Sequence, residues 1–119
     1  MKIAVTSTGR ELDSTVDPRF GRAAYILIVD SDTLAVDVLD NAENVNAFKG
    51  AGIQAAGMIS DHQAEVLLTG FCGPNAFKAL AAANIKVAGD VSGTVREAVR
   101  ACVAGDVNWT TEPNAQGHW

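Results

Sequence analysis

Short apolar runs alternate with polar, glycine-containing segments along the chain, and their periodicity predicts eight elements. Continuous apolar runs indicate strands buried on both faces, whereas the alternation over 34–38 indicates a half-buried strand. Apolar residues at helical spacing indicate three helices between the later strands. The predicted strands are 3–5, 24–29, 34–38, 65–69 and 85–88, and the predicted helices are 50–63, 74–84 and 94–105.

Helix boundary signals support two of these helices. Pro74 suits the first helical position, because its missing N–H would have no partner there, and Asn84 suits the end of that helix. Thr94 and Glu97 have the spacing of a capping box, and Gly105 suits the C-terminal end of the last helix.

The order of these elements predicts an α/β domain with a five-stranded mixed sheet. A hairpin of strands precedes βαβ units, so the first, fourth and fifth strands run parallel with the hairpin at one side. Ligands favour the loops at the carboxyl ends of parallel strands, where we expect 7–22, 70–74 and 89–93 to meet. We interpret 1–105 as a single domain and 106–119, which has no periodicity, as a C-terminal tail.

Size and charge narrow the class of protein. The 119 residues suit one domain, and 9 Lys+Arg against 14 Asp+Glu give a formal charge of −5, which disfavours a nucleic-acid binder. No apolar run approaches the roughly 20 residues of a membrane span. The apolar start is too short for a signal peptide, so we expect a cytoplasmic protein without membrane contact.

The two cysteines exclude a disulfide framework and a four-thiolate zinc site. A site with one or two protein ligands for a preformed cofactor remains open. Cys72 lies between Gly70 and Pro74, near a predicted helix N-terminus, where a thiolate is favoured and flanking glycines let backbone N–H groups approach a ligand. The alternative is a small buried residue in a tight turn. Cys102 lies on an apolar helical stripe, which favours a core position.

The first loop offers positive charge for an anion. Arg10, Arg19 and Arg22 lie among glycines there and suit a carboxylate, a phosphate or an anionic cluster. Three acidic residues of the same loop support the alternative of a solvated loop with internal ion pairs.

The two histidines are further candidate metal ligands. His62 falls near the end of a predicted helix, where the helix dipole favours a capping role over ligation. His118 is next to the C-terminus, where a solvated side chain is expected, although Trp119 could dock the tail.

Four segments together resemble the dinitrogenase iron–molybdenum cofactor biosynthesis family, which includes NifX and the C-terminal region of NifB. They are the DPRFGRA motif at 17–23, GFCGPNAF at 70–77, GTVREA at 93–98 and the ending at 112–119. The similarity covers nearly the whole chain.

The resemblance implies a ribonuclease-H-like three-layer fold with a five-stranded mixed sheet whose second strand is antiparallel. It also implies a non-enzymatic protein that binds or carries iron–molybdenum cofactor, its precursors or another molybdenum, iron or copper sulfide cluster. Cys72 would be the metal ligand, with His118 of the last segment as a further candidate, whereas His62 lies in none of the four segments. The cofactor-binding set would be Arg19, Phe20, Gly21, Arg22, Gly70, Cys72 and Gly73.

Three functional hypotheses therefore stand. The leading one is a cluster carrier or scaffold that exchanges cargo with donor or acceptor proteins. The second is a thiol-dependent or nucleotide-handling enzyme, which would need a cysteine of lowered pKa. The third is a cofactor-free interaction or regulatory module. The outer strand of the hairpin offers an edge for pairing, so we expect a monomer or a weak homodimer.

Overall fold

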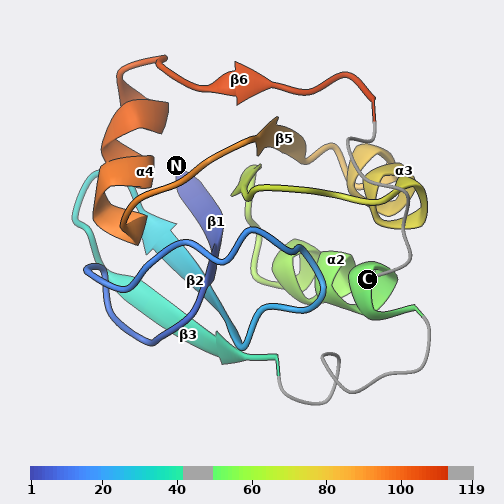
Figure 1. Cartoon of the computed structure of the whole chain (residues 1–119), viewed down its shortest axis with the longest axis horizontal. Helices are drawn as coiled ribbons and strands as arrows, with labels where there is room; N and C mark the ends of the chain where they lie inside the picture. Colours follow the sequence, from blue (N-terminus) through green and yellow to red (C-terminus); the bar gives the residue numbers. More distant parts are fainter. Residues whose placement is uncertain (42–49, 113–119) are drawn as a thin grey trace.

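The computed structural model describes residues 1–41 and 50–112, which form a six-stranded sheet and three helices (Figure 1). The strands are β1 Lys2–Ser7, β2 Tyr25–Asp30, β3 Val36–Asp40, β4 Val66–Leu68, β5 Lys86–Gly89 and β6 Asn108–Trp109. The helices are α2 Ala51–Asp61, α3 Pro74–Ala82 and α4 Val95–Val103. Within these described ranges, no helix has the length and apolar character needed to cross a membrane.

The sheet has the predicted mixture of strand directions. Its order is β3-β2-β1-β4-β5-β6, with β1, β4 and β5 parallel and β2 antiparallel to both β1 and β3. The hairpin of β2 and β3 therefore lies at one side, as the sequence predicts. The ribonuclease-H-like classification stays a prediction.

The predicted count of five strands is wrong, because a sixth strand pairs antiparallel with β5. Trp109 pairs with Ala88, and the N–H of Thr110 donates to the carbonyl of Val87 at 2.8 Å. Two residues are too few to show a periodic pattern, so only the open edge of β5 defines this strand. β6 lies beyond residue 105, and the division of the chain into a domain and a tail stays a prediction.

The elements form three layers, with α4 on one face of the sheet and α2 and α3 on the other (Figure 1). Each face has its own apolar core. Leu67 of β4 packs in the core with Leu80 of α3, whereas its neighbour Leu68 packs in the core with Val99 of α4. Because successive side chains of a strand point to opposite faces, this arrangement explains why the central strands are continuously apolar.

The boundary signals in the sequence work as predicted. Pro74 is the first residue of α3, and Asn84 has a φ of +60° just after that helix ends. Thr94 caps α4, its side chain accepting from the N–H of Glu97 at 3.1 Å, while the Glu97 carboxylate accepts from the N–H of Thr94 at 3.0 Å. Both bonds of the capping box are therefore present.

Candidate functional site

The three predicted loops meet at the carboxyl ends of the parallel strands. The N–H of Phe71 donates to the carbonyl of Pro18 at 2.6 Å, and the N–H of Phe20 donates to the carbonyl of Phe71 at 3.1 Å. The N–H of Asp90 donates to the carbonyl of Gly70 at 2.9 Å, which attaches the third loop. Backbone hydrogen bonds therefore hold segments together that are far apart in the sequence.

One half of the first loop closes the N-terminus of α4. Within 8–16, the carbonyl of Ser14 accepts from the N–H of Val95 at 2.9 Å, and the carbonyl of Leu12 accepts from the N–H of Arg96 at 2.8 Å. The next N–H along the helix, that of Glu97, donates to the Thr94 side chain in the capping box. The N–H groups in the first turn of α4 therefore already have hydrogen-bond acceptors within the protein.

The N-termini of α2 and α3 are different, because no side chain of the described residues caps either of them. Their N-cap residues are Gly50 and Gly73, and neither helix has an acidic residue in its first turn. Since Pro74 has no N–H, the N–H groups of Asn75 and Ala76 form the open end of α3. Such ends carry partial positive charge and favour anions.

Glycine contacts bring these two helix ends against the arginine-containing loop. A Cβ at Gly21, whose φ is +94°, would lie 2.9 Å from the backbone nitrogen of Gly52 in the first turn of α2. A Cβ at Gly52 would lie 2.7 Å from the Cβ of Ala76 in the first turn of α3. A Cβ at Gly70 would lie 2.7 Å from Pro18. Loop 18–22 therefore packs closely against the first turn of α2, which in turn packs closely against the first turn of α3.

Loop 18–22 carries the two arginines of the predicted set. The Arg19 side chain is 53% exposed, and its Nε lies 3.7 Å from Oδ1 of Asp17. Arg22 is half-buried, and its N–H donates to the carbonyl of Arg19 at 3.2 Å. Phe20 lies between the arginines and is buried in the core under α2 and α3. The phenylalanine therefore anchors the loop in this core.

Cys72 lies under the surface formed by loop 18–22 and the N-termini of α2 and α3, rather than on it. Its side chain is 1% exposed and belongs to the core on the α2 and α3 face. Burial raises the pKa of the Cys72 thiol from 9.0 to about 12. The expected thiolate-favouring environment is therefore wrong for this conformation, because desolvation outweighs the nearby helix end. The alternative of a small buried residue in a tight turn describes the observed position.

Cys102 and His62 lie away from this surface. Cys102 is buried in the α4 core, as predicted. His62 ends α2, with its Nδ1 2.9 Å from the carbonyl oxygen of Met58, which confirms the capping interpretation. An 11-residue helix is about 16 Å long, so His62 lies far from the N-terminus of α2. His118 lies outside the described residues.

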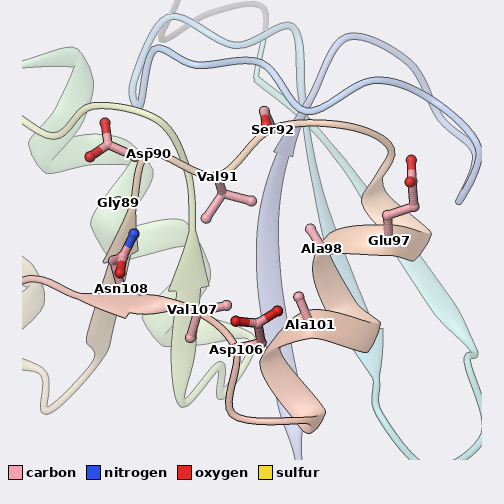
Figure 2. Close-up of a pocket in the computed structure, with 10 residues that line it drawn as sticks. All are labelled: Gly89, Asp90, Val91, Ser92, Glu97, Ala98, Ala101, Asp106, Val107 and Asn108. Atoms are coloured by element: carbon pink, nitrogen blue, oxygen red, sulfur yellow. The ribbon is translucent and has the colours of Figure 1, made fainter.

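A cavity of about 250 Å³ lies between β5, α4 and β6, and residues of the third loop form part of its lining (Figure 2). Its lining includes the carboxylates of Asp90, Glu97 and Asp106 and has no lysine or arginine. In Figure 2 these carboxylates come from separate segments and do not converge. Among the described residues, no group of three histidine, cysteine or acidic side chains is placed to hold a metal ion. This cavity does not suit an anion.

Sequence reasoning expected backbone N–H groups beside Cys72, but it did not point to those in the first turns of α2 and α3. Gly52, Asn75 and Ala76 were absent from the predicted set, because an N–H group has no side-chain signature. The available signals were the glycines at 50 and 52 and the uncapped start of α3 at Pro74. Neither signal shows that the two helix ends adjoin.

Comparison with known proteins identifies a family and several similar structures. The family model described as dinitrogenase iron–molybdenum cofactor matches residues 1–105. The structure of the apo form of the orange protein from Desulfovibrio gigas is 48% identical, with a TM-score of 0.93 and 96% of each chain covered. No protein with a curated description matches the sequence.

Two further structures show how widely the fold is shared. A Thermotoga protein provisionally named NifB is 33% identical, with a TM-score of 0.83 and 98% of each chain covered. A provisionally named dinitrogenase from Methanocaldococcus jannaschii is 16% identical, with a TM-score of 0.68, covering 95% of this chain and 97% of that one. The last similarity supports the fold alone.

Proposed function

The chain belongs to the dinitrogenase iron–molybdenum cofactor family, and we propose that it binds and carries a preformed anionic metal–sulfur cluster. The cargo is iron–molybdenum cofactor, one of its precursors, or a related iron, molybdenum or copper sulfide cluster. The role is that of a carrier without catalysis, which receives the cluster from a donor protein and passes it to an acceptor. The similarity to a protein described in its apo form supports a protein with a separable cofactor.

One observation carries this proposal: the first turns of α2 and α3, neither capped by a side chain of the described residues, pack together next to a loop with two arginines. The helix ends supply N–H donors, and Arg19 and Arg22 supply full positive charge. The whole chain has a formal charge of −5, and the cavity between β5, α4 and β6 is lined by three carboxylates and by no lysine or arginine. An anion is therefore favoured at this surface and disfavoured at the cavity.

The surface suits a sulfide-rich anion in particular. Bridging and terminal sulfides accept hydrogen bonds from backbone N–H groups, and such bonds tune bound clusters. Phe71, next to the arginine loop, is 37% exposed and offers an apolar contact to a weakly hydrated, polarisable ligand. Such contacts include few directed bonds between the protein and the cluster, which suits a protein that must release its cargo.

The predicted set divides into two roles in this proposal. Arg19, Arg22 and the backbone around Gly73 contact the cargo, whereas Phe20, Gly21 and Gly70 shape the loop through burial and close packing. Cys72 lies directly beneath, and a metal–sulfur bond would require its thiol to leave the core and lose its proton. The same raised pKa argues against a thiol-dependent enzyme.

The test is a titration with tetrathiomolybdate, a soft molybdenum–sulfide anion, followed by visible absorption without oxygen. Arg19→Gln removes a charge from the proposed surface, and Arg100→Gln removes one from exposed α4 as a matched control. We expect Arg19→Gln to weaken binding about ten-fold, which is typical for the loss of a charge-assisted hydrogen bond. The Arg100→Gln variant should bind like wild type.

Molybdate serves as the hard-anion comparison in the same titration, and it should bind more weakly than tetrathiomolybdate. Absence of tetrathiomolybdate binding would overturn the carrier role in favour of the cofactor-free interaction module. Equal losses in the two arginine variants would show that only net charge matters. Cytoplasmic location and a monomeric or weakly dimeric state stay predictions.

A further inference from the structure

We infer that Asp17 is a built-in competing anion of the cargo surface. Its carboxylate pairs with Arg19 and loses that partner when an anionic cluster binds. Asp17 thereby limits affinity and speeds release. This inference rests on the proposed function, because it concerns how the same surface controls its cargo.

The contact between the Asp17 carboxylate and the Arg19 guanidinium is loose. Oδ1 of Asp17 accepts a hydrogen bond from the backbone N–H of Arg19 at 3.0 Å. The same oxygen lies 3.7 Å from the Arg19 Nε, which is within ion-pair range but beyond a good hydrogen bond. The guanidinium is therefore attracted to the carboxylate without a directed bond between these two atoms.

Asp17 is the fixed member of the pair. Its N–H donates to the carbonyl of Thr6 at 2.9 Å, and its carbonyl accepts from the Thr6 hydroxyl at 2.6 Å. The hydroxyls of Thr6 and Thr69 are 2.9 Å apart and hydrogen-bonded, which joins this position to the ends of β1 and β4. The Asp17 side chain is only 10% exposed. The carboxylate is thus part of the rigid sheet edge.

Arg19 is the mobile member, because its long side chain is 53% exposed and has many rotamers. When a cluster occupies the surface, the guanidinium can turn from the carboxylate to the sulfides, while Asp17 stays in place. Arg19 must give up its attraction to Asp17 when it turns to the cargo. The loss of that attraction cancels part of the binding energy between Arg19 and the cargo. The remaining negative charge of Asp17 also repels the bound anion.

The test compares Asp17→Asn with wild type by tetrathiomolybdate titration and by stopped-flow dissociation. Asparagine keeps the shape and an oxygen for the N–H of Arg19, but it lacks the charge. We expect Asp17→Asn to bind about two- to five-fold tighter, mainly through slower dissociation, as removal of a partly exposed ion pair predicts. The matched control is Asp13→Asn, which removes the carboxylate 3.0 Å from Arg96 beside α4 and should leave affinity unchanged.

A double-mutant cycle separates competition from other effects. In an Arg19→Gln background, Asp17→Asn should lose most of its effect, because the competed partner is gone. Equal tightening in both backgrounds would show a general field effect and overturn the inference. Weaker binding by Asp17→Asn would mean that the carboxylate positions Arg19 productively, which also overturns it. If the wild-type protein fails to bind tetrathiomolybdate, the carrier proposal is overturned, and this inference with it. If wild type binds but Asp17→Asn has no effect, only this inference is overturned and the carrier proposal stands. Matching thermal unfolding curves would show that the variants are folded.

Discussion

Replacing Cys72 by alanine tests the conclusion that this cysteine is a protonated core residue. The side chain is 1% exposed and packs under α2 and α3, so the variant loses the contacts of one buried sulfur. At pH 7 we expect the free energy of unfolding to fall by about 1–2 kcal/mol, which is typical for removing one buried heavy atom and leaving a small void.

The pH dependence is the sharper part of this prediction. Because the pKa of Cys72 is about 12 in the folded protein and near 9.0 in the unfolded chain, the folded state holds the proton more tightly. The stabilisation from this difference is fully present below pH 9 and is lost as pH rises towards 12. The loss is about 1.4 kcal/mol per pH unit, or about 3 kcal/mol by pH 11.

Alanine has no proton to lose, so the advantage of wild type over Cys72→Ala should vanish and reverse near pH 11. Urea unfolding at pH 7, 9, 10 and 11, followed by circular dichroism, measures both proteins. The Cys102→Ala variant is the control, because it retains Cys72 and should keep most of the alkaline loss. A constant difference between wild type and Cys72→Ala at every pH would refute the reasoning. Rapid alkylation of native Cys72 at neutral pH would refute it as well.

Three further substitutions test the site and its scaffold. Gly21→Ala should lower the free energy of unfolding in urea by about 2 kcal/mol or more, because φ is +94° and the new Cβ meets the backbone of Gly52. The same substitution should weaken tetrathiomolybdate binding. A variant with unchanged stability and affinity would contradict the close packing. Thr94→Ala should cost about 1 kcal/mol by loss of the α4 cap, with tetrathiomolybdate affinity unchanged in the same titration. His62→Ala should leave that affinity unchanged, because His62 lies at the far end of α2, and a clear loss would restore it as a ligand.

Local patterns along the chain were enough to determine most of the fold. The apolar runs over 24–29 and 65–69 mark strands that must be covered on both faces, and Pro74 and Thr94 mark where helices begin. These signals depend on near neighbours in the sequence, and the topology follows because a hairpin and βαβ units connect in few ways. The meeting of the three loops at one edge followed from the same topology.

Features that depend on distant partners were decided only by the tertiary structure. β6 exists because β5 leaves an edge beside it, and two residues carry no pattern of their own. The ionisation of Cys72 reverses the local expectation, because the surrounding core, and not the adjacent helix end, sets the cost of a charge. The surface that we propose for the cargo depends on Gly21 and Gly52 bringing backbone N–H groups together, and such groups are the same in every sequence until the chain has folded.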